Sequence, residues 1–216
     1  NPSQVGYLIF FVTNVCNFRC DFCFYSSEIV KGEKPDQLSL DEIDKFSKKL
    51  GSLVQLSLTG GETYLRKDFT ELTDILIKNT KPMYVSTPTN GSLPDRIYDH
   101  YNYLLPKYPN TYFRNVFSIE GIGEVHDNLR GVKNSFKKII KSYEKLLLLR
   151  EKYKNLVVDS NSVFTKNSED TLLDTIKYLR KNFNFDNISV TYARGSIPDE
   201  KLKSKSHDKY KEINDL

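Results

Sequence analysis

The residues of this sequence with the clearest potential for chemistry are its three cysteines, Cys16, Cys20 and Cys23. All of them fall within eight consecutive positions. Spacings of four and three could also place them on one helical face, where free cysteines pack as small apolar residues. However, the segment follows a strand-like run, and polar or charged residues such as Asn17 and Asp21 separate the cysteines. We therefore favour three thiolates that converge on one metal centre.

The number of thiolates indicates an open site. Tetrahedral zinc and iron–sulfur clusters usually take four protein ligands. Three cysteines are one short of that number, and the sequence contains no fourth. A metal centre with a free position favours chemistry over a purely structural role.

The elements that must position these cysteines alternate regularly between strand and helix patterns. The cysteines follow a run of β-branched and aromatic residues, Tyr-Leu-Ile-Phe-Phe-Val-Thr, which is typical of a buried strand. Ser39-Leu40-Asp41-Glu42 is a capping box that opens a helix. Strands are predicted at 7–13, 53–59, 83–87, 112–119, 156–164 and 188–192, and helices from 39, at 68–79, 94–105, 135–154 and 169–182, and from 201. This alternation predicts one α/β domain with a parallel sheet wound by right-handed crossovers.

Glycines after the predicted strands indicate where a ligand would sit. Strand ends often need glycine for turns alone. In a parallel α/β sheet, however, the carboxyl ends of the strands also form the ligand crevice, and glycine allows close backbone approach. The cysteine segment lies at the same end, after the first strand. The glycines in question are Gly60, Gly61, Gly91, Gly121, Gly123 and Gly195.

Composition excludes several classes of protein. The chain has 216 residues, of which 38% are hydrophobic and 28% charged, which is typical of a globular domain with a solvated surface. A net charge of +4 gives no warrant for a nucleic-acid partner, and no apolar run approaches the roughly 20 residues of a membrane span. Three clustered cysteines do not make a disulfide framework, so we expect a reducing, cytoplasmic setting. Because the chain opens at Asn1-Pro2 without methionine, we expect a cut or processed piece.

Several motifs, each following a predicted strand, together resemble the radical S-adenosylmethionine (radical SAM) superfamily. The resemblance covers nearly the whole chain and is strongest to the branch with molybdenum-cofactor cyclases and SPASM-type peptide maturases. The motifs are Cys16-x-x-x-Cys20-x-Phe22-Cys23, Gly60-Gly61-Glu62, Thr89-Asn90-Gly91, and Ser118-Ile119-Glu120-Gly121 with His126-Asp127-x-x-Arg130-Gly131.

The resemblance implies a fold and an activity. It implies that residues 1–216 form a radical SAM core domain, an open, partial (βα)6 TIM-like barrel with parallel strands. The cysteines Cys16, Cys20 and Cys23 would hold a [4Fe-4S] cluster, with SAM on its fourth iron. An electron from an external donor would cleave SAM to a 5′-deoxyadenosyl radical, which abstracts hydrogen from an unknown substrate, either a peptide or a small molecule. From composition, we expect no nucleic acid and no membrane among the partners.

The resemblance also implies roles for single residues, each of which has a plainer alternative. Gly61 and Glu62 would receive the SAM amino group, although a glutamate at a turn is often merely solvated. Arg130 would pair with the SAM carboxylate, unless it is a surface arginine, and Ser118 would be a neighbouring donor. The remaining implied contacts to adenine or ribose are Phe22, Asn90 and Asn161, of which Phe22 could equally be a core residue.

The histidines carry weaker signals. His126, beside Asp127, could act as a base or ligand, but its motif position favours a structural, hydrogen-bonding role. His100 and His207 lack any supporting pattern, and we expect both at the surface. The five lysines in 201–211 are interpreted as a solvated helix face.

Two departures from the family pattern concern the substrate side of the site. Thr63 stands where the family often has proline, and Glu120 stands where aspartate is expected. Neither departure removes a cysteine or a motif glycine. Separately, a second hypothesis is kept, a non-catalytic module that holds an iron–sulfur cluster or zinc. Relatives that modify peptides carry further cysteines in a C-terminal extension, and this chain has none after Cys23.

Overall fold

The computed structural model of the chain describes residues 6–29 and 37–215. The N-terminal Asn1-Pro2, the polar stretch with Gly32, Lys34 and Pro35, and Leu216 lie outside the described residues. The strands are β1 (Tyr7–Thr13), β2 (Gln55–Gly60), β3 (Tyr84–Thr89), β4 (Tyr112–Ser118), β5 (Leu156–Phe164) and β6 (Ile188–Tyr192). The α-helices are α1 (Leu40–Ser47), α2 (Phe69–Thr80), α3 (Pro94–Lys107), α4 (Glu124–Arg130), α5 (Ser135–Lys152), α6 (Leu172–Asn182) and α7 (His207–Asn214), with short 3₁₀ turns at Ser26–Glu28, Thr63–Leu65 and Glu200–Leu202.

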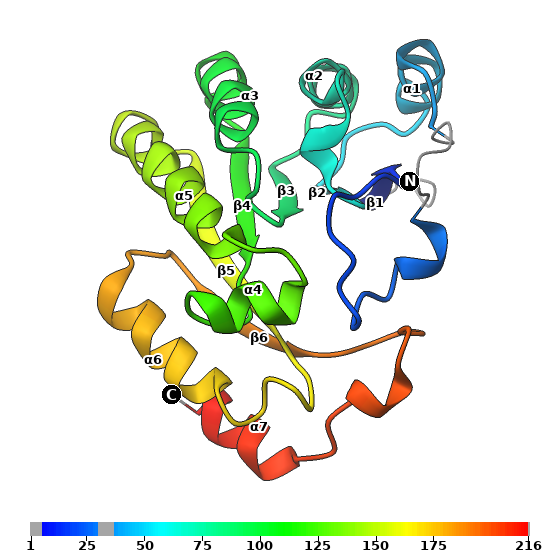
Figure 1. Cartoon of the computed structure of the whole chain (residues 1–216). Coiled ribbons are helices and arrows are strands. Elements are labelled where there is room, and N and C mark those ends of the chain that lie inside the picture. The colour runs from blue at the N-terminus through cyan, green and yellow to red at the C-terminus, as the bar shows by residue number, and fades with distance from the viewer. Residues whose placement is uncertain (1–5, 30–36, 216) are drawn as a thin grey trace.

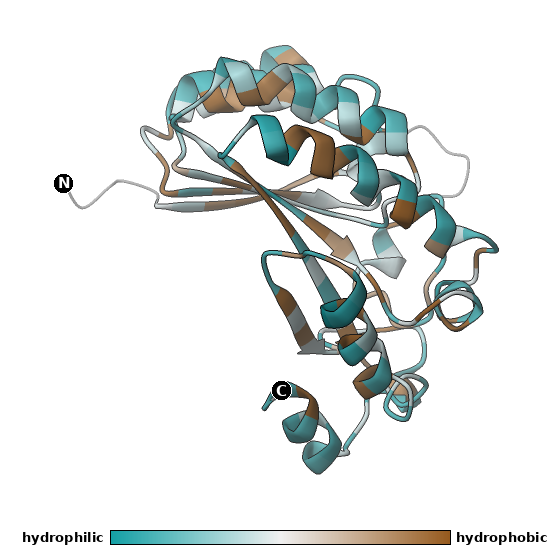
Figure 2. Ribbon diagram, turned by 90° about the vertical axis from the view of Figure 1, so that its left-hand side faces the viewer, coloured by the Kyte–Doolittle hydropathy of each residue, from teal (hydrophilic) through white to brown (hydrophobic). Residues whose placement is uncertain are grey.

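The strands form one curved, open sheet in the order β1-β2-β3-β4-β5-β6, and every described pairing is parallel. Helices α1, α2, α3 and α5 lie along the outer side of the sheet, and α6 continues this layer beside β6 (Figures 1 and 2). Each helix connects two neighbouring parallel strands, which is the pattern of a βα barrel. The predicted open, partial α/β barrel is therefore confirmed.

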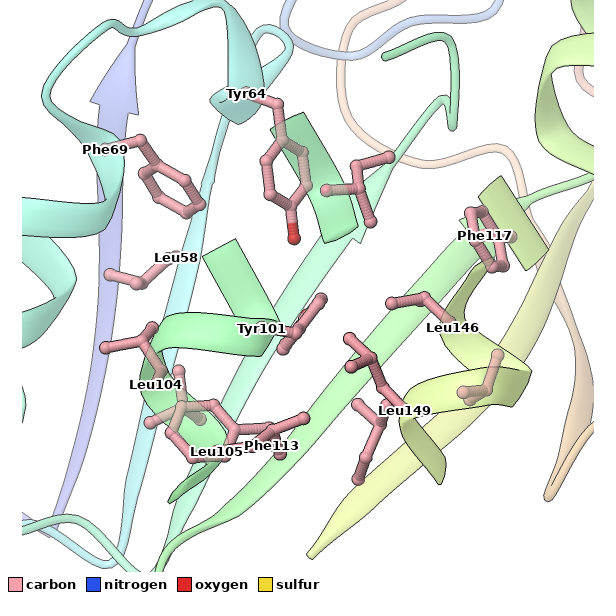
Figure 3. Packing of buried hydrophobic residues seen from close by; sticks show 14 of the residues in the cluster. Leu58, Tyr64, Phe69, Tyr101, Leu104, Leu105, Phe113, Phe117, Leu146 and Leu149 are labelled. Atoms are coloured by element: carbon pink, nitrogen blue, oxygen red, sulfur yellow. The ribbon is translucent and has the colours of Figure 1, made fainter. Parts of the chain in front are cut away.

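The main core lies between the sheet and this helix layer. Strand residues that point outward, such as Leu58, Phe113 and Phe117, pack against Leu104 of α3 and Leu146 of α5 (Figure 3). All five side chains are fully buried. The alternate residues of the same strands point into the concave, inner side of the sheet, as expected for a period of two. This alternation divides each strand into a structural face and a face available to a ligand.

Local sequence accounts for most of the element boundaries. The capping box is present, because the Ser39 hydroxyl accepts from the Glu42 N–H and the Ser39 N–H donates to Glu42 Oε2 at 2.8 Å. Pro94 begins α3, where its missing N–H is tolerated. The helix predicted at 94–105 extends to Lys107, and Pro106 lies inside its last turn. The helix expected from Lys201 begins at His207.

One surface assignment made from the sequence is wrong. His100 is 1% exposed, stacks on Phe69 with ring centroids 4.7 Å apart, and shares a hydrogen bond of 3.0 Å with Thr70. A histidine on the apolar face of α3 is buried because that face packs on α2. Leu148 of the apolar run Leu146–Leu149 in α5 is 63% exposed, because one helical face cannot hold four consecutive residues.

Helix α4 was not predicted. It has seven residues and is bounded by two glycines with positive φ, Gly123 at 56° and Gly131 at 67°. Asp127 on this helix then starts the next one, because its carboxylate accepts from the N–H groups of Asn134 and Phe136 at the beginning of α5. The short α4 holds His126 and Arg130 in their buried positions. Among the described residues, no helix has the length and hydropathy needed to cross a membrane.

Candidate active site

The three cysteines line one cavity of about 150 Å³ at the carboxyl ends of the first four strands. An adjoining cavity of about 230 Å³ shares Cys20, Cys23, Ser118 and Arg130 with it and extends toward β5 and β6. The sequence-predicted residues in the first cavity are Cys16, Cys20, Cys23, Gly61, Glu62, Asn90, Ser118 and Arg130. Phe22 and Asn161 line the second. All ten predicted site residues therefore gather at one end of the sheet.

The glycines after β2 allow the cysteine loop to lie against that strand. A Cβ on Gly61 would stand 2.1 Å from the carbonyl oxygen of Val15 and 3.1 Å from Cβ of Cys16. A Cβ on Gly60 would stand 2.2 Å from the carbonyl oxygen of Thr13. Two backbone hydrogen bonds hold the segments together, from the Gly61 N–H to Thr13 and from the Glu62 N–H to Val15. The glycines are thus required by the protein's own backbone.

Asn17 joins the cysteine loop to the end of β3, and sequence reasoning missed it. Its amide donates to the Ser92 hydroxyl at 2.9 Å and accepts from the Asn90 amide at 2.9 Å. Asn90 in turn accepts from the Ser92 N–H at 3.0 Å. Its position between two cysteines was a usable signal, because a polar residue inside a ligand loop often orders that loop.

The cysteine thiols lie in an environment that disfavours free thiolates. Burial raises the pKa of Cys16 to about 11, and the carboxylate of Glu62 and the other two cysteines act in the same direction. Burial also raises the pKa of Cys23. The Arg130 guanidinium donates to the Cys20 sulfur at 3.4 Å. Three thiols around one cavity therefore need a further positive charge before all can ionise.

Glu62 is buried, with 2% of its surface exposed, and its carboxylate is held by the end of β3. One oxygen accepts from the Thr89 hydroxyl at 2.8 Å and the other accepts from the Asn90 N–H at 2.8 Å. Burial raises the pKa of Glu62, although these hydrogen bonds and Arg130 oppose the shift. The interpretation of Glu62 as a solvated turn residue is therefore wrong. The first oxygen also accepts from the Tyr64 N–H at 3.4 Å, whereas the second keeps a lone pair, so the side chain can still receive a cation from the cavity.

Arg130 is buried beside the cysteines and forms an ion pair with Glu120. Its Nη2 lies 2.5 Å from Glu120 Oε1, and the other Glu120 oxygen accepts from the Val163 N–H at 2.8 Å. Burial alone would lower the pKa of Arg130, but the charge of Glu120 keeps it raised. Its Nε–H is buried without a partner among the described residues. A buried, unpartnered donor beside a cavity fits an anionic ligand group. The alternative interpretation of Arg130 as a surface arginine is wrong, because the residue is buried.

His126 holds the backbone of Glu120, the ion-pair partner of Arg130. Its Nδ1 accepts from the Glu120 N–H at 3.1 Å, so the ring carries its proton on Nε2. Burial lowers the pKa of His126 to about 3, and Arg130 acts in the same direction. The ring is therefore neutral at neutral pH and orients the Glu120 backbone. The structural role expected for His126 agrees with this contact.

Phe22, Ser118 and Asn161 line the second cavity. The Arg130 guanidinium lies over the Phe22 ring at 5.4 Å from its centroid, and Phe22 also packs with Phe18 and Cys20. Ser118 lines both cavities. Asn161 bonds to the hydroxyls of Thr191 and Ser189 on β6. These contacts leave aromatic and amide groups facing the larger cavity.

Comparison with known proteins supports one family. The family model described as the radical SAM superfamily matches residues 10–179. GTP 3′,8-cyclase of Mannheimia succiniciproducens is 29% identical over 178 residues, which cover 79% of this chain and 48% of that protein. GTP 3′,8-cyclase of Yersinia pestis is 37% identical over 91 residues, 39% of this chain and 26% of that protein. The chain thus spans about half the length, or less, of these curated relatives.

Solved structures resemble the whole described chain. The structure of anSMEcpe with bound AdoMet matches with a TM-score of 0.71 and 25% sequence identity. The match covers 98% of this chain and 57% of the anSMEcpe chain. Streptococcus suis SuiB bound to S-adenosylmethionine matches with a TM-score of 0.72 and 18% sequence identity. The match covers 99% of this chain and 47% of the SuiB chain. The SuiB likeness supports the fold alone. The family match over most of the chain, together with the cysteine motif at the carboxyl end of a parallel open barrel, shows that this chain belongs to the radical SAM superfamily.

Proposed function

We propose that this chain is the SAM-cleaving core of a radical SAM enzyme, in which Cys16, Cys20 and Cys23 hold a [4Fe-4S] cluster. The observation that carries the proposal is the convergence of three thiols, a buried carboxylate and a buried guanidinium on one cavity. When bound, the cluster would supply the electron that cleaves SAM and starts hydrogen abstraction from a peptide or small-molecule substrate.

The distribution of the cysteines around the cavity fits a cluster. A cluster binds each thiolate on a different iron, so it requires cysteines placed around a cavity. The cluster's positive irons would also provide the charge that the buried thiols need to ionise.

The charged residues complement the two ends of the SAM methionine. Glu62, with the neighbouring Gly61 backbone, would receive the ammonium group. Arg130 would receive the carboxylate through its unpartnered Nε–H, with Ser118 beside it. Phe22 and Asn161 line the larger cavity, where the adenosine would lie, and Asn90 lines the adjoining smaller cavity. Enclosure by the cysteine loop would limit water at the reacting centre.

The test is anaerobic reconstitution of the full chain with iron and sulfide, followed by iron analysis, visible absorption and detection of 5′-deoxyadenosine after reduction. Wild-type protein is expected to bind one cluster and to release 5′-deoxyadenosine from SAM. The triple variant Cys16→Ala, Cys20→Ala, Cys23→Ala is expected to do neither. SAM cleavage by the triple variant would refute the proposal, and a colourless, zinc-loaded wild type indifferent to SAM would favour the non-catalytic module.

A further inference from the structure

Arg130 of α4 donates a hydrogen bond to one of the three cysteine sulfurs. Its Nη1 lies 3.4 Å from Cys20 Sγ, although the two residues are 110 positions apart in the sequence. Cys16 Sγ instead accepts from the Phe18 N–H, also at 3.4 Å, which is a neutral donor inside the cysteine loop. The Arg130 carbonyl oxygen lies 4.0 Å from Cys20 Sγ, a contact in which only a protonated thiol can act as donor. The guanidinium is therefore the group of Arg130 that fits a sulfur carrying negative charge.

Contacts outside the cysteine loop hold the guanidinium in this position. Nη2 of Arg130 lies 2.5 Å from Glu120 Oε1, and the other Glu120 oxygen accepts from the Val163 N–H at 2.8 Å. The guanidinium also lies over the Phe22 ring, 5.4 Å from its centroid. Because Arg130 is buried, these contacts and not solvent set its orientation. Nη1 thus serves the sulfur and Nη2 serves Glu120, whereas Nε has no partner among the described residues.

A donor on a sulfur that binds a cluster affects the reduction potential, because reduction adds one negative charge. The cluster takes up one electron from an external one-electron donor, its formal charge becomes one unit more negative, and no bond forms or breaks. The sulfur ligands share the added charge, so a hydrogen bond to a sulfur is stronger in the reduced form. The reduced form is stabilised, and the reduction potential rises. The charges of Arg130 and Glu120 cancel, so the effect comes from the guanidinium lying on the sulfur side of the pair.

We propose that Arg130 raises the reduction potential of the cluster through its hydrogen bond to Cys20, and that Glu120 is the positioning residue for Arg130. The inference rests on the proposed function, because it concerns the cluster that the three cysteines would hold. Arg130 thereby has two roles, since Nη1 serves the cluster and Nε is left for the SAM carboxylate. The length of Glu120 suits this task. An aspartate is shorter by one C–C bond, about 1.5 Å, and does not span from the Val163 N–H to Arg130 at these distances.

The test is a redox titration of the anaerobically reconstituted full chain without SAM, with dithionite as reductant and EPR spectroscopy as the measure of the reduced cluster. The double variant Arg130→Met, Glu120→Gln removes the hydrogen bond, keeps the net charge of the pair at zero and leaves no unpaired buried ion. We expect a midpoint potential lower than that of wild type by about 59 mV, which is a tenfold change in the equilibrium constant of a one-electron couple. Glu120→Asp should shift the potential in the same direction by a smaller amount. Iron content is measured for every protein.

Arg194→Met is the matched control for the loss of a positive charge. Arg194 lines the second cavity together with Cys20 and Cys23, but its guanidinium lies over the Phe24 ring, 5.5 Å from its centroid. Arg194 is exposed, so solvent screens its charge. The potential of Arg194→Met should therefore stay close to that of wild type.

A spectroscopic measurement on the Arg130 contact does not depend on the folding of a variant. In wild-type protein labelled with ¹⁵N-arginine, pulsed EPR of the reduced cluster should detect a ¹⁵N coupling from the guanidinium. Arg19, whose Nη1 donates to the carbonyl oxygens of Cys16 and Phe18, is the other arginine beside the cysteines in question. Labelled Arg19→Gln should keep the coupling, which assigns it to Arg130.

Three results would overturn the inference and leave cluster binding and SAM cleavage intact. They are equal potentials for wild type and the double variant at full iron content, equal shifts for the double variant and Arg194→Met, and no ¹⁵N coupling in labelled Arg19→Gln. A wild-type chain that binds no cluster would instead refute the proposed function, and this inference with it.

Discussion

The contact between Gly61 and the cysteine loop leads to a quantitative prediction. Gly61 does not have a positive φ, so Gly61→Ala tests space alone. The added methyl would lie 2.1 Å from the carbonyl oxygen of Val15 and 2.6 Å from its carbon, distances that no relaxed structure tolerates. The neighbouring atoms are backbone, so no side-chain rotation can relieve the contact. The cysteine loop must move away from β2.

The magnitude follows from what that movement breaks. Overpacking of a tight contact costs about 1–3 kcal/mol. Separation of the segments also breaks the bonds from Gly61 to Thr13 and from Glu62 to Val15, each worth about 1 kcal/mol. The lower entropy of the unfolded alanine chain returns only about 0.4–1 kcal/mol. We expect a net loss of about 2–4 kcal/mol, or roughly 4–16 °C in melting temperature for a chain of this size.

The assay combines thermal unfolding with iron content after anaerobic reconstitution. Gly6→Ala is the matched control, because a Cβ at Gly6 meets nothing within 4 Å, and its stability should change by less than about 0.5 kcal/mol. Gly61→Ala should melt at lower temperature and also retain less iron, because the added methyl lies against Cys16. Identical melting and full iron loading of both variants would refute the steric reasoning.

Two further predictions concern buried charges. Glu120→Gln leaves the buried Arg130 without its ionic partner and should destabilise the fold by about 3–5 kcal/mol, measured as a lower melting temperature. Burial lowers the pKa of His100 to about 3, so the ring stays neutral in the folded state. In the unfolded state the same ring binds a proton below about pH 6.5. The free energy of unfolding therefore falls as the pH drops below about 6.5. Between pH 7 and pH 5 this loss is about 2 kcal/mol for each such histidine. Because His126 behaves in the same way, His100→Phe should remove about half of the combined loss in urea titrations at the two pH values.

Each of these predictions has a control in the same chain. Asp44→Asn removes an exposed ion pair to Lys48 and should leave the melting temperature nearly unchanged, unlike Glu120→Gln. His207→Gln replaces an exposed histidine and is the matched control for the substitution. Equal melting shifts for Glu120→Gln and Asp44→Asn, or an unchanged pH dependence in His100→Phe, would contradict the assigned environments.

Local sequence determined most of the elements and the residues of the candidate site. A strand or a capped helix is specified by residues that are neighbours in the chain, so the bounds of β1, β5 and β6 agree with those predicted. The cysteine motif is also local, and parallel topology alone brings the ends of successive strands to one edge. For that reason all ten predicted site residues lie around two adjoining cavities.

Only the tertiary structure decided which distant residues became partners. Whether Arg130 meets Glu120, or Arg114 meets Asp159, depends on strand register and on a short helix between glycines. The burial of His100 depends on the packing of α2 against α3. Such pairings are set by the free energy of the whole packed arrangement, in which burial of a polar group is tolerated only where a partner has also been positioned. Sequence patterns encode periodicity and motif, but they do not encode that positioning.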